Sequence, residues 1–230
     1  MTMMNLACKL PLAFAAMLYS VMAFSSVARA EATFSVYGGA NFSPHSNVKY
    51  KATAGAAVKE FTPGWDGASF EMPPYWGIRA TWWLEDMPEI GIALDYSHGK
   101  AVAEKSVATA NDFTTLEFTD GINLATINAL YRWRMDNGFT PYVGAGAGIA
   151  FPKVEVTNPT DGIDINEYQI TGGTVQAFAG VDYKVNDNWS VFGEVKSNYT
   201  PVRASLPNGG SLDVNIVNNQ FIFGLTFSFQ

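Results

Sequence analysis

Apolar and polar side chains alternate with a period of two along most of this 230-residue chain. The final segment, residues 214–229, places five large apolar side chains on one face, namely Phe221, Phe223, Leu225, Phe227 and Phe229. The opposite face carries small or polar residues such as Gly224, Thr226 and Ser228. Because successive side chains of a β-strand point to opposite faces, this pattern predicts a strand with one fully apolar surface. Such a surface needs lipid or a protein core against it.

Eight segments follow this alternation, and most have the length of a tilted membrane strand. They are residues 34–43, 76–82, 89–98, 122–133, 140–151, 176–184, 190–199 and 214–229. Three connections are short, at residues 85–89, 135–139 and 185–188, and four are long, at residues 44–74, 99–119, 152–173 and 200–213. A soluble β-sandwich, the alternative for an aromatic-rich chain, has no reason to sort its loops this way. We therefore predict an all-β fold, an eight-stranded antiparallel transmembrane up-and-down β-barrel with four long extracellular loops and three short periplasmic turns.

The first thirty residues differ from the rest. Lys9 gives a basic start, residues 10–24 are apolar, and the sequence ARA at 28–30 has the form of a cleavage site, so residues 1–30 are predicted to be a secretory signal peptide. A membrane anchor is the alternative, but the apolar run is shorter than the roughly 20 residues that span a bilayer. Residues 31–230 are then the barrel domain, in the outer membrane of a Gram-negative bacterium.

Charge and cysteine content narrow the possible functions. The chain has 14 Lys and Arg against 21 Asp and Glu, and loss of Lys9 and Arg29 with the signal peptide leaves 12 basic residues and a net charge of −9. Such a surface does not favour nucleic acid as a partner. The single cysteine, Cys8, also lies in the signal peptide, so the exported chain is predicted to have no disulfide.

Several charged residues fall within the predicted membrane strands. An arginine facing lipid near the midplane costs about 2 to 4 kcal/mol, so Arg79 must point into the lumen. The same alternation directs five more charged residues inward: Asp95, Arg132, Asp182, Glu194 and Lys196. A channel or proton path is one reading of these charges. An eight-stranded barrel is only wide enough for side chains to fill it, however, so we predict ion pairs, including Arg79 with Asp95, that close the lumen.

The long loops hold most of the remaining basic residues, which are Lys49, Lys51, Lys59, Lys100, Lys105, Lys153 and Arg203. They form either a solvated surface or a set of ligands for the phosphates of lipopolysaccharide. The predicted partners are lipid A and lipopolysaccharide, the outer-membrane lipids, and the barrel-insertion machinery that would read the aromatic terminal strand. The barrel is expected to be a monomer.

Four segments resemble the outer-membrane lipid A oxidases of rhizobial and related bacteria. They are SPHSNVKY (43–50), GWDGASFEMPPYWGIRATWW (64–83), LEFTDGINLATINALYRW (116–133) and TPYVGAGAGIAFPKVEVT (140–157). The resemblance implies oxidation of the proximal glucosamine of lipid A to 2-aminogluconate, with molecular oxygen as oxidant and peroxide as product. The alternative is a non-enzymatic OmpA-like barrel that stabilises the envelope or binds a surface partner, which requires only strands and loops.

Such an oxidation needs a base and a route for electrons to oxygen, and protein side chains supply no redox centre. Imidazole with carboxylates is a ligand set of oxygen-using metal sites. His45, Glu117 and Asp120 fall at the predicted extracellular rim, and Asp66 lies on the first long loop. We therefore predict His45, Glu117 and Asp120 as ligands of a divalent metal ion with O2 as co-substrate, and these three with Asp66 as candidate catalytic residues. Solvated or capping roles are the alternative.

The second histidine of the chain, His98, lies near the end of the third predicted strand. The alternation places it on the lipid side together with Tyr96. We therefore expect His98 to be an interfacial residue instead of a metal ligand.

Overall fold

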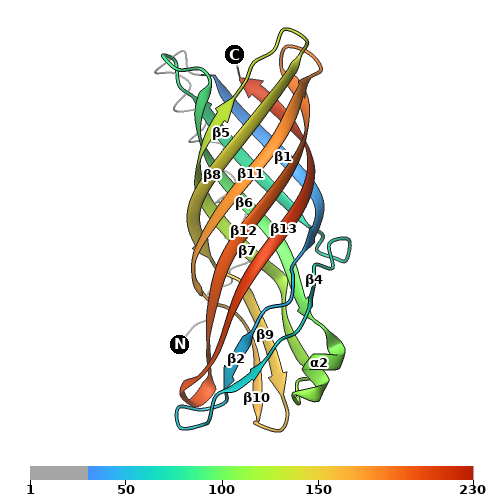
Figure 1. Cartoon of the computed structure of the whole chain (residues 1–230), viewed down its shortest axis with the longest axis vertical. Coiled ribbons are helices and arrows are strands. Elements are labelled where there is room, and N and C mark those ends of the chain that lie inside the picture. The colour runs from blue at the N-terminus through green and yellow to red at the C-terminus, as the bar shows by residue number, and fades with distance from the viewer. Residues whose placement is uncertain (1–30, 230) are drawn as a thin grey trace, which may run out of the picture.

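Eight antiparallel strands close into a barrel in the computed structural model, which describes residues 31–229 (Figure 1). The predicted signal peptide, residues 1–30, and Gln230 lie outside the described residues, as does the side chain of Asp120. The barrel strands are β1 (Ala32–Phe42), β5 (Trp76–Trp83), β6 (Ile90–Ala103), β7 (Thr115–Arg132), β8 (Phe139–Ala150), β11 (Gly172–Lys184), β12 (Trp189–Leu206) and β13 (Gly210–Phe229). Neighbours in the chain pair in this order, and β13 pairs with β1 to close the barrel. The predicted eight-stranded architecture is confirmed.

Three short turns join β5 to β6, β7 to β8 and β11 to β12. All three lie at the end of the barrel where β1 begins and β13 finishes (Figure 1). In the second turn, Gly138 has a φ of 83°, a left-handed conformation that suits glycine. Because short turns of outer-membrane barrels face the periplasm, we refer to this as the periplasmic end.

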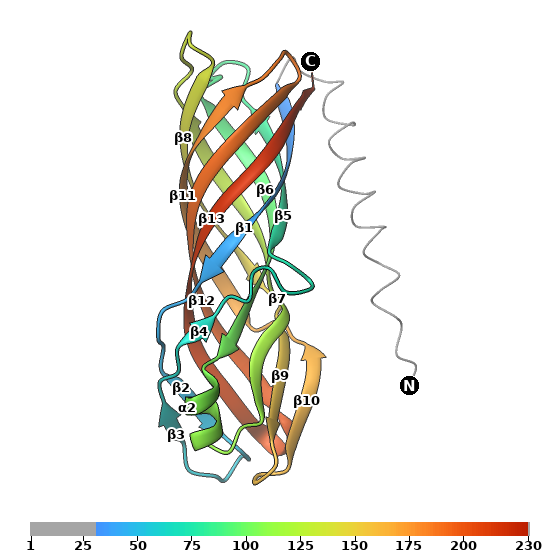
Figure 2. The same ribbon diagram turned by 90° about the vertical axis from the view of Figure 1, so that its right-hand side faces the viewer.

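The opposite end carries more regular structure than the predicted long loops. Its elements are β2 (Val48–Lys51), β3 (Lys59–Phe61), β4 (Trp65–Asp66), α2 (Lys105–Ala110), β9 (Lys153–Asn158), β10 (Ile163–Tyr168) and η2 (Pro207–Gly209). β4 pairs with β6, β9 with β7, and β2 with β13. Together with the distal ends of β6, β7, β12 and β13, these elements form what we call the extracellular lobe (Figure 2). No helix in the described part of the chain is both long and apolar enough to cross a membrane.

The prediction of a long loop at residues 200–213 is wrong. β12 continues to Leu206 and β13 starts at Gly210, so only a three-residue turn separates the two strands. The strands continue because Val202, Ala204 and Leu206 point inward, where they are buried. The alternation therefore persists beyond the membrane strand and gives this hairpin an apolar inner face.

The lobe has an aliphatic and aromatic core of its own, separate from the aromatic cluster inside the barrel. Its fully buried members include Val48, Tyr50, Phe113, Phe118, Leu212 and Ile216. The rings of Tyr50 and Phe113 meet edge to face, 4.9 Å apart, and the Tyr50 hydroxyl donates a hydrogen bond of 2.9 Å to Asp161. Burial raises the pKa of the Tyr50 phenol above its usual value, and the bond to Asp161 adds to this effect.

The polarity of the two strand faces reverses along the chain, and this reversal marks the outer edge of the membrane. On β12 the inner face changes from Glu194 and Lys196 to Val202 and Leu206, whereas the outer face changes from apolar to polar. β13 shows the same outer change, since Phe221 and Phe223 are exposed apolar residues and Asn219 follows toward the lobe. Lipid therefore contacts the barrel up to about the level of Phe221.

A band of aromatic residues surrounds the periplasmic end, with ring pairs Tyr131–Trp133, Phe139–Tyr183 and Trp189–Phe227 all within 5.0 Å between centroids. Aromatic rings favour the boundary between lipid and water. The two boundaries of the membrane are thus marked by an aromatic band at one end and a reversal of polarity at the other.

Candidate functional site

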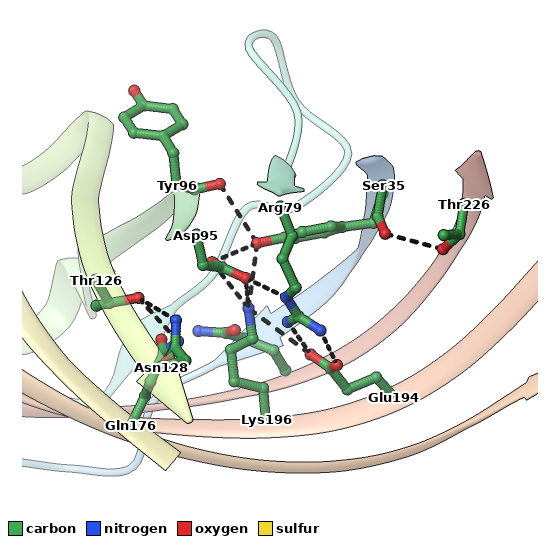
Figure 3. A network of polar contacts seen from close by, with 12 residues as sticks. Ser35, Arg79, Asp95, Tyr96, Thr126, Asn128, Gln176, Glu194, Lys196 and Thr226 are labelled. Carbon is green, nitrogen blue, oxygen red and sulfur yellow. Dashed lines mark hydrogen bonds and ion pairs between the residues drawn. The ribbon is translucent and has the colours of Figure 1, made fainter. Parts of the chain in front are cut away.

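Four charged side chains meet at the centre of the lumen (Figure 3). Arg79 Nε lies 2.7 Å from Asp95, and its two terminal nitrogens donate to Glu194 at 2.6 and 2.8 Å. Lys196 Nζ lies 3.3 Å from Asp95. All four residues are buried, so two cations and two anions balance one another. The predicted inward direction of these residues and the Arg79–Asp95 ion pair are confirmed.

Aromatic rings fill the space around this network. Tyr37 donates to Asp95 at 2.8 Å, Tyr142 donates to Glu194 at 2.9 Å, and the Arg79 guanidinium lies 4.4 Å from the centroid of Phe178. The Phe178 ring packs against Gly144 of the neighbouring strand, where an added Cβ would come within 2.3 Å of it. This close approach explains why position 144 requires glycine.

A second polar layer lies between the charged network and the lobe. Gln176 donates to Asn128 at 2.6 Å and accepts from Asn198 at 2.7 Å, and Tyr75 donates to Gln220 at 2.8 Å. Beyond this layer comes the apolar core of the lobe. The lumen is therefore filled at three successive levels, and the barrel is not built as a pore.

A cavity of about 1070 Å³ occupies the periplasmic half of the lumen and reaches Arg79. At its mouth, Arg132 donates to both carboxylate oxygens of Glu31, at 3.0 and 2.7 Å, and its guanidinium lies 3.7 Å from the centroid of a Trp83 ring. Burial raises the pKa of the Glu31 carboxyl, and the charge of Arg134 opposes that shift. These contacts hold the start of β1 in place. They lie at the periplasmic end and are not part of an extracellular site.

The outer wall carries a polar and aromatic cluster at the level where the polarity reverses, which we call the rim cluster: Trp76, Tyr96, His98, Asn123 and Phe151. Trp76, His98 and Asn123 lie directly opposite one another on β5, β6 and β7. Tyr96 donates to Asn123 Oδ1 at 2.8 Å, and His98 Nδ1 lies 3.1 Å from the same oxygen. Three strands thus place an imidazole, an amide and a phenol within hydrogen-bonding reach on one face.

His98 lies on the outer face with Tyr96, as predicted, but is only 5% exposed. Its ring stacks on Trp76 with 6.1 Å between centroids. The backbone of Gly121, which has a φ of 105°, lies so close that an added Cβ would be 2.3 Å from His98 Nδ1. The histidine is thus packed against both a tryptophan and the chain of β7.

The predicted site residues His45 and Asp66 are both exposed. A Cβ added to Gly64 would lie 3.2 Å from His45 Nε2 and 3.6 Å from Glu104 Oε2, so the histidine and a glutamate that sequence reasoning missed both approach Gly64. Asp66 Oδ1 accepts a hydrogen bond of 2.9 Å from the amide of Ala68. That bond is a turn contact of the capping kind.

Glu117 lies on β7 opposite Glu155 on β9. The Thr119 hydroxyl bridges them, 3.1 Å from Glu117 and 2.9 Å from Glu155, and Lys153 forms an ion pair of 3.1 Å with Glu155. Asp66 shares this outward face, because it pairs with Val102, which in turn pairs with Glu117. Two strand spacings of about 4.8 Å separate their backbones.

Among the residues that the structure describes, no three His, Cys, Asp or Glu side chains gather closely enough to hold a metal ion. His45 packs against Gly64, whereas Glu117 is joined to Glu155 through the Thr119 hydroxyl. The third proposed ligand, Asp120, lies on β7 with its side chain outside the described part. A metal site formed by His45, Glu117 and Asp120 therefore stays a prediction.

The basic residues of the predicted loops divide into paired and open ones. Lys59 pairs with Asp112 at 3.2 Å, and Lys49 lies 3.9 Å from Glu60. Lys105 and Arg203 are exposed. The prediction for Lys100 is wrong, because this residue lies within β6 and not in a loop. It is 4% exposed and donates to two backbone carbonyls. Its ammonium group is occupied and does not face a phosphate.

Comparison with known proteins supports the fold. The sequence matches the outer membrane protein beta-barrel domain over residues 12–229, and no curated protein matches it. OprG from Pseudomonas aeruginosa is similar in structure, with 13% identity and a TM-score of 0.51 over 87% of this chain and 94% of that chain. Neisserial surface protein A has 13% identity and a TM-score of 0.48 over 87% and 97% of the two chains. AlkL has 15% identity and a TM-score of 0.48 over 87% and 90%.

At 13% identity the similarity to OprG concerns the fold alone. The closed barrel, its lipid-facing surface and the match over residues 12–229 together place the protein in the outer membrane of a Gram-negative bacterium. The chain belongs to the outer membrane protein beta-barrel domain family.

Proposed function

We propose that this barrel is a lipid A oxidase that acts in the outer leaflet, as the resemblance of four of its segments implies. The observation that supports the proposal is their convergence. Trp65, in the second segment, donates to Ser46 of the first at 2.7 Å. Asn123 of the third donates to the carbonyl of Phe151 in the fourth at 3.4 Å. Residues scattered between 43 and 157 thus meet around β5, β6, β7 and β9.

The meeting point suits a lipid substrate because of its height. On β7 the outward face changes from the exposed Ile127 to Asn123 within four residues. The rim cluster therefore lies beside the lipid headgroups, where a glucosamine in the leaflet approaches from the side. Trp76 and Tyr96 are partly exposed members of the cluster, and the buried His98 and Asn123 hold them in place. An aromatic ring and a phenol hydroxyl are groups that can pack against a sugar and hydrogen-bond to it.

The proposed reaction is a two-electron oxidation at C1 of the proximal glucosamine. The C1–H and hydroxyl O–H bonds break, a C1=O bond forms, and O2 takes up two electrons and two protons to become peroxide. Water then opens the lactone to the carboxylate of 2-aminogluconate. A metal or cofactor supplies the redox chemistry in such a reaction. Trp76 and Tyr96 contact the sugar, and Asn123 positions Tyr96.

The experiment is mass spectrometry of lipid A from a strain that lacks this chain and from the same strain after complementation. Complementation is expected to add one oxygen atom to the proximal sugar, and Asn123→Ala is expected to reduce that product at least about tenfold. Asn219→Ala, which lies outside the rim cluster, is the matched control and should retain the product. Absence of the product with a correctly folded barrel, shown by heat-modifiable migration on a gel, would overturn the proposal.

The second candidate is a non-enzymatic barrel whose lobe binds a surface partner. Its supporting observation is the separate core of the lobe, which gives the lobe a folded surface without a three-ligand cluster among the described residues. The two candidates differ in one result. A chimeric barrel carries the lobe segments of an unrelated small barrel in place of its own. If this chimera leaves lipid A unmodified while the native chain restores its oxidation, the non-enzymatic candidate fails.

A further inference from the structure

The loop between β4 and β5, residues 67–75, projects sideways from the barrel wall in both views (Figures 1 and 2). Its tip carries Phe70 and Met72, each 84% exposed, more than any other large apolar side chain among residues 31–229. Large apolar side chains are seldom left this open to water without a partner. The tip is therefore a candidate contact surface.

The base of this loop is held firmly, so the exposure of the tip is built into the fold. The amide of Asn41 donates to Ser69 Oγ at 2.8 Å, and that hydroxyl lies 2.9 Å from Asn41 Oδ1. The Tyr75 amide donates to the Ser69 carbonyl at 2.8 Å. Gly67 lies so close to Asn41 that an added Cβ would be 1.9 Å from its carbonyl oxygen.

Lys100 holds the tip of the loop in place. Its ammonium group donates to the carbonyl of Glu71 at 3.1 Å and to that of Met72 at 3.0 Å. The side chain is buried and lies on the outer face of β6, two residues beyond His98. A buried cation is costly unless it is well satisfied, so its use to hold two loop carbonyls points to a defined tip conformation.

The height of the loop coincides with the edge of the membrane. Its base rests on Asn41, next to Phe42, and Phe42 pairs with Asn219 at the level where the outer face of β13 turns polar. Phe42 and Phe221 are both half exposed and stack 6.3 Å apart. The eleven residues of β1 are joined by ten steps of about 3.3 Å, and at a tilt of about 40° these rise roughly 25 Å, which is the height of the apolar band.

We propose that residues 67–75 form a lipid finger that inserts Phe70 and Met72 into the acyl-chain boundary of the outer leaflet. The finger continues the lipid-facing surface of Phe42 and Phe221 outward from the wall. It runs directly into Trp76, and Lys100, which holds its tip, lies two residues beyond His98 on β6, so the finger brings lipid next to the rim cluster. The proposal rests on height, exposure and anchoring, and it stands whether or not the barrel is an oxidase.

The test places a nitroxide label at the tip of the full mature barrel. The only native cysteine, Cys8, lies in the predicted signal peptide, so Phe70→Cys and Met72→Cys give singly labelled proteins. Val58→Cys is the matched control, since Val58 is also an exposed apolar residue but lies far out in the lobe. The labelled proteins are reconstituted in phosphatidylcholine vesicles, with and without lipopolysaccharide, and collisions with oxygen and with a polar nickel complex are measured.

The label at position 70 or 72 is expected to show a ratio of oxygen to nickel collisions about tenfold above that at position 58, because oxygen partitions into apolar surroundings. Equal ratios at the three positions in both kinds of vesicle would overturn the proposal. A ratio that rises with the number of proteins per vesicle would assign the tip to contacts between copies, and would also overturn it.

Lys100→Met supplies the second variant. It retains the length of the side chain and removes the ammonium group, so the ratio at position 72 should fall toward that at position 58 while heat-modifiable migration stays unchanged. A folded Lys100→Met barrel with an unchanged ratio would show that Lys100 does not hold the finger.

Discussion

The membrane part of the barrel and the extracellular lobe are built from the same strands with opposite rules. Inside the membrane, β12 buries Glu194 and Lys196 in the lumen and shows Val195 to lipid; in the lobe it buries Val202 and Leu206. The hydrogen-bond register passes through the change without interruption. The surrounding solvent, not the strand, thus decides which face is apolar. The comparison predicts that the same kind of substitution will have a large effect at one level and a small or local effect at the other.

The largest expected effect is in the lumen of the membrane part. Glu194→Gln removes one of the two anions that balance Arg79 and Lys196, so it should lower the free energy of unfolding by about 3 to 5 kcal/mol. Urea titration in phospholipid vesicles measures this. The double variant Arg79→Met/Glu194→Gln leaves Asp95 with Lys196 and should recover part of the loss; a single variant that costs nothing would contradict the closed network.

Truncating a side chain in the lobe core should have nearly as large an effect on stability, but the effect should be confined to the lobe. Phe118 is fully buried, with its ring 5.8 Å from that of Trp65, so Phe118→Ala should cost the lobe about 3 to 5 kcal/mol. Limited proteolysis should then cleave the lobe while the barrel keeps its heat-modifiable migration. Ile127→Ala, on the lipid face, is the control that should alter neither. Loss of both regions together would show that they are a single folding unit.

The third prediction compares one face of one strand at two heights. Val195→Arg places a charge against lipid and should cost about 2 to 4 kcal/mol. Ser205→Arg, ten residues farther along the same outward face, lies in water and should change stability by no more than about 0.5 kcal/mol. Both are measured by the same urea titration, and equal costs would move the membrane edge away from the level proposed.

The smallest effect concerns the hydroxyl of Tyr50. Tyr50→Phe removes the bond to Asp161 and should cost the lobe about 1 kcal/mol. Because burial raises the pKa of Tyr50 in the folded lobe, the phenol ionises first in the unfolded chain, so its contribution is present below a pH of about 10 and is lost above it. Limited proteolysis across that pH range should show that the lobe loses stability at alkaline pH, and that Tyr50→Phe makes this loss smaller. Identical pH profiles for the two proteins would show that Tyr50 does not contribute in this way.

The barrel could be predicted from the sequence because its alternation is extreme. Arg79 between apolar neighbours has only one tolerable direction in a membrane, and Asp95 sits directly across from it on the next strand. The lobe could not be predicted as readily, because its strands repeat the alternation with weaker contrast. Between residues 200 and 213, for example, Pro201, Pro207 and the Asn208–Gly210 turn residues favoured a loop, although Val202 and Leu206 kept the inward phase.

The candidate site was predictable in part. Its level at the outer edge of the membrane can be predicted from where the strands end. The outward direction of His98 can be predicted because it alternates in phase with Tyr96. The neighbours of the predicted ligands do not follow, because β4 and β9 pair with β6 and β7 across long stretches of chain. The approach of Glu104 to Gly64, where His45 also packs, and the position of Glu155 opposite Glu117 emerge only when those pairings are formed.

The closing seam has a consequence for the order of folding. β12 and β13 are joined by a three-residue turn, so their pairing involves almost no loop closure, whereas β1 and β13 bring together residues as far apart as Ala32 and Phe229. Contacts between distant parts of a chain form slowly. We therefore expect the seam to form last and to set the overall rate. Until then, the edges of β1 and β13 are the two unpaired edges of an open sheet, and these are the edges open to any assembly factor.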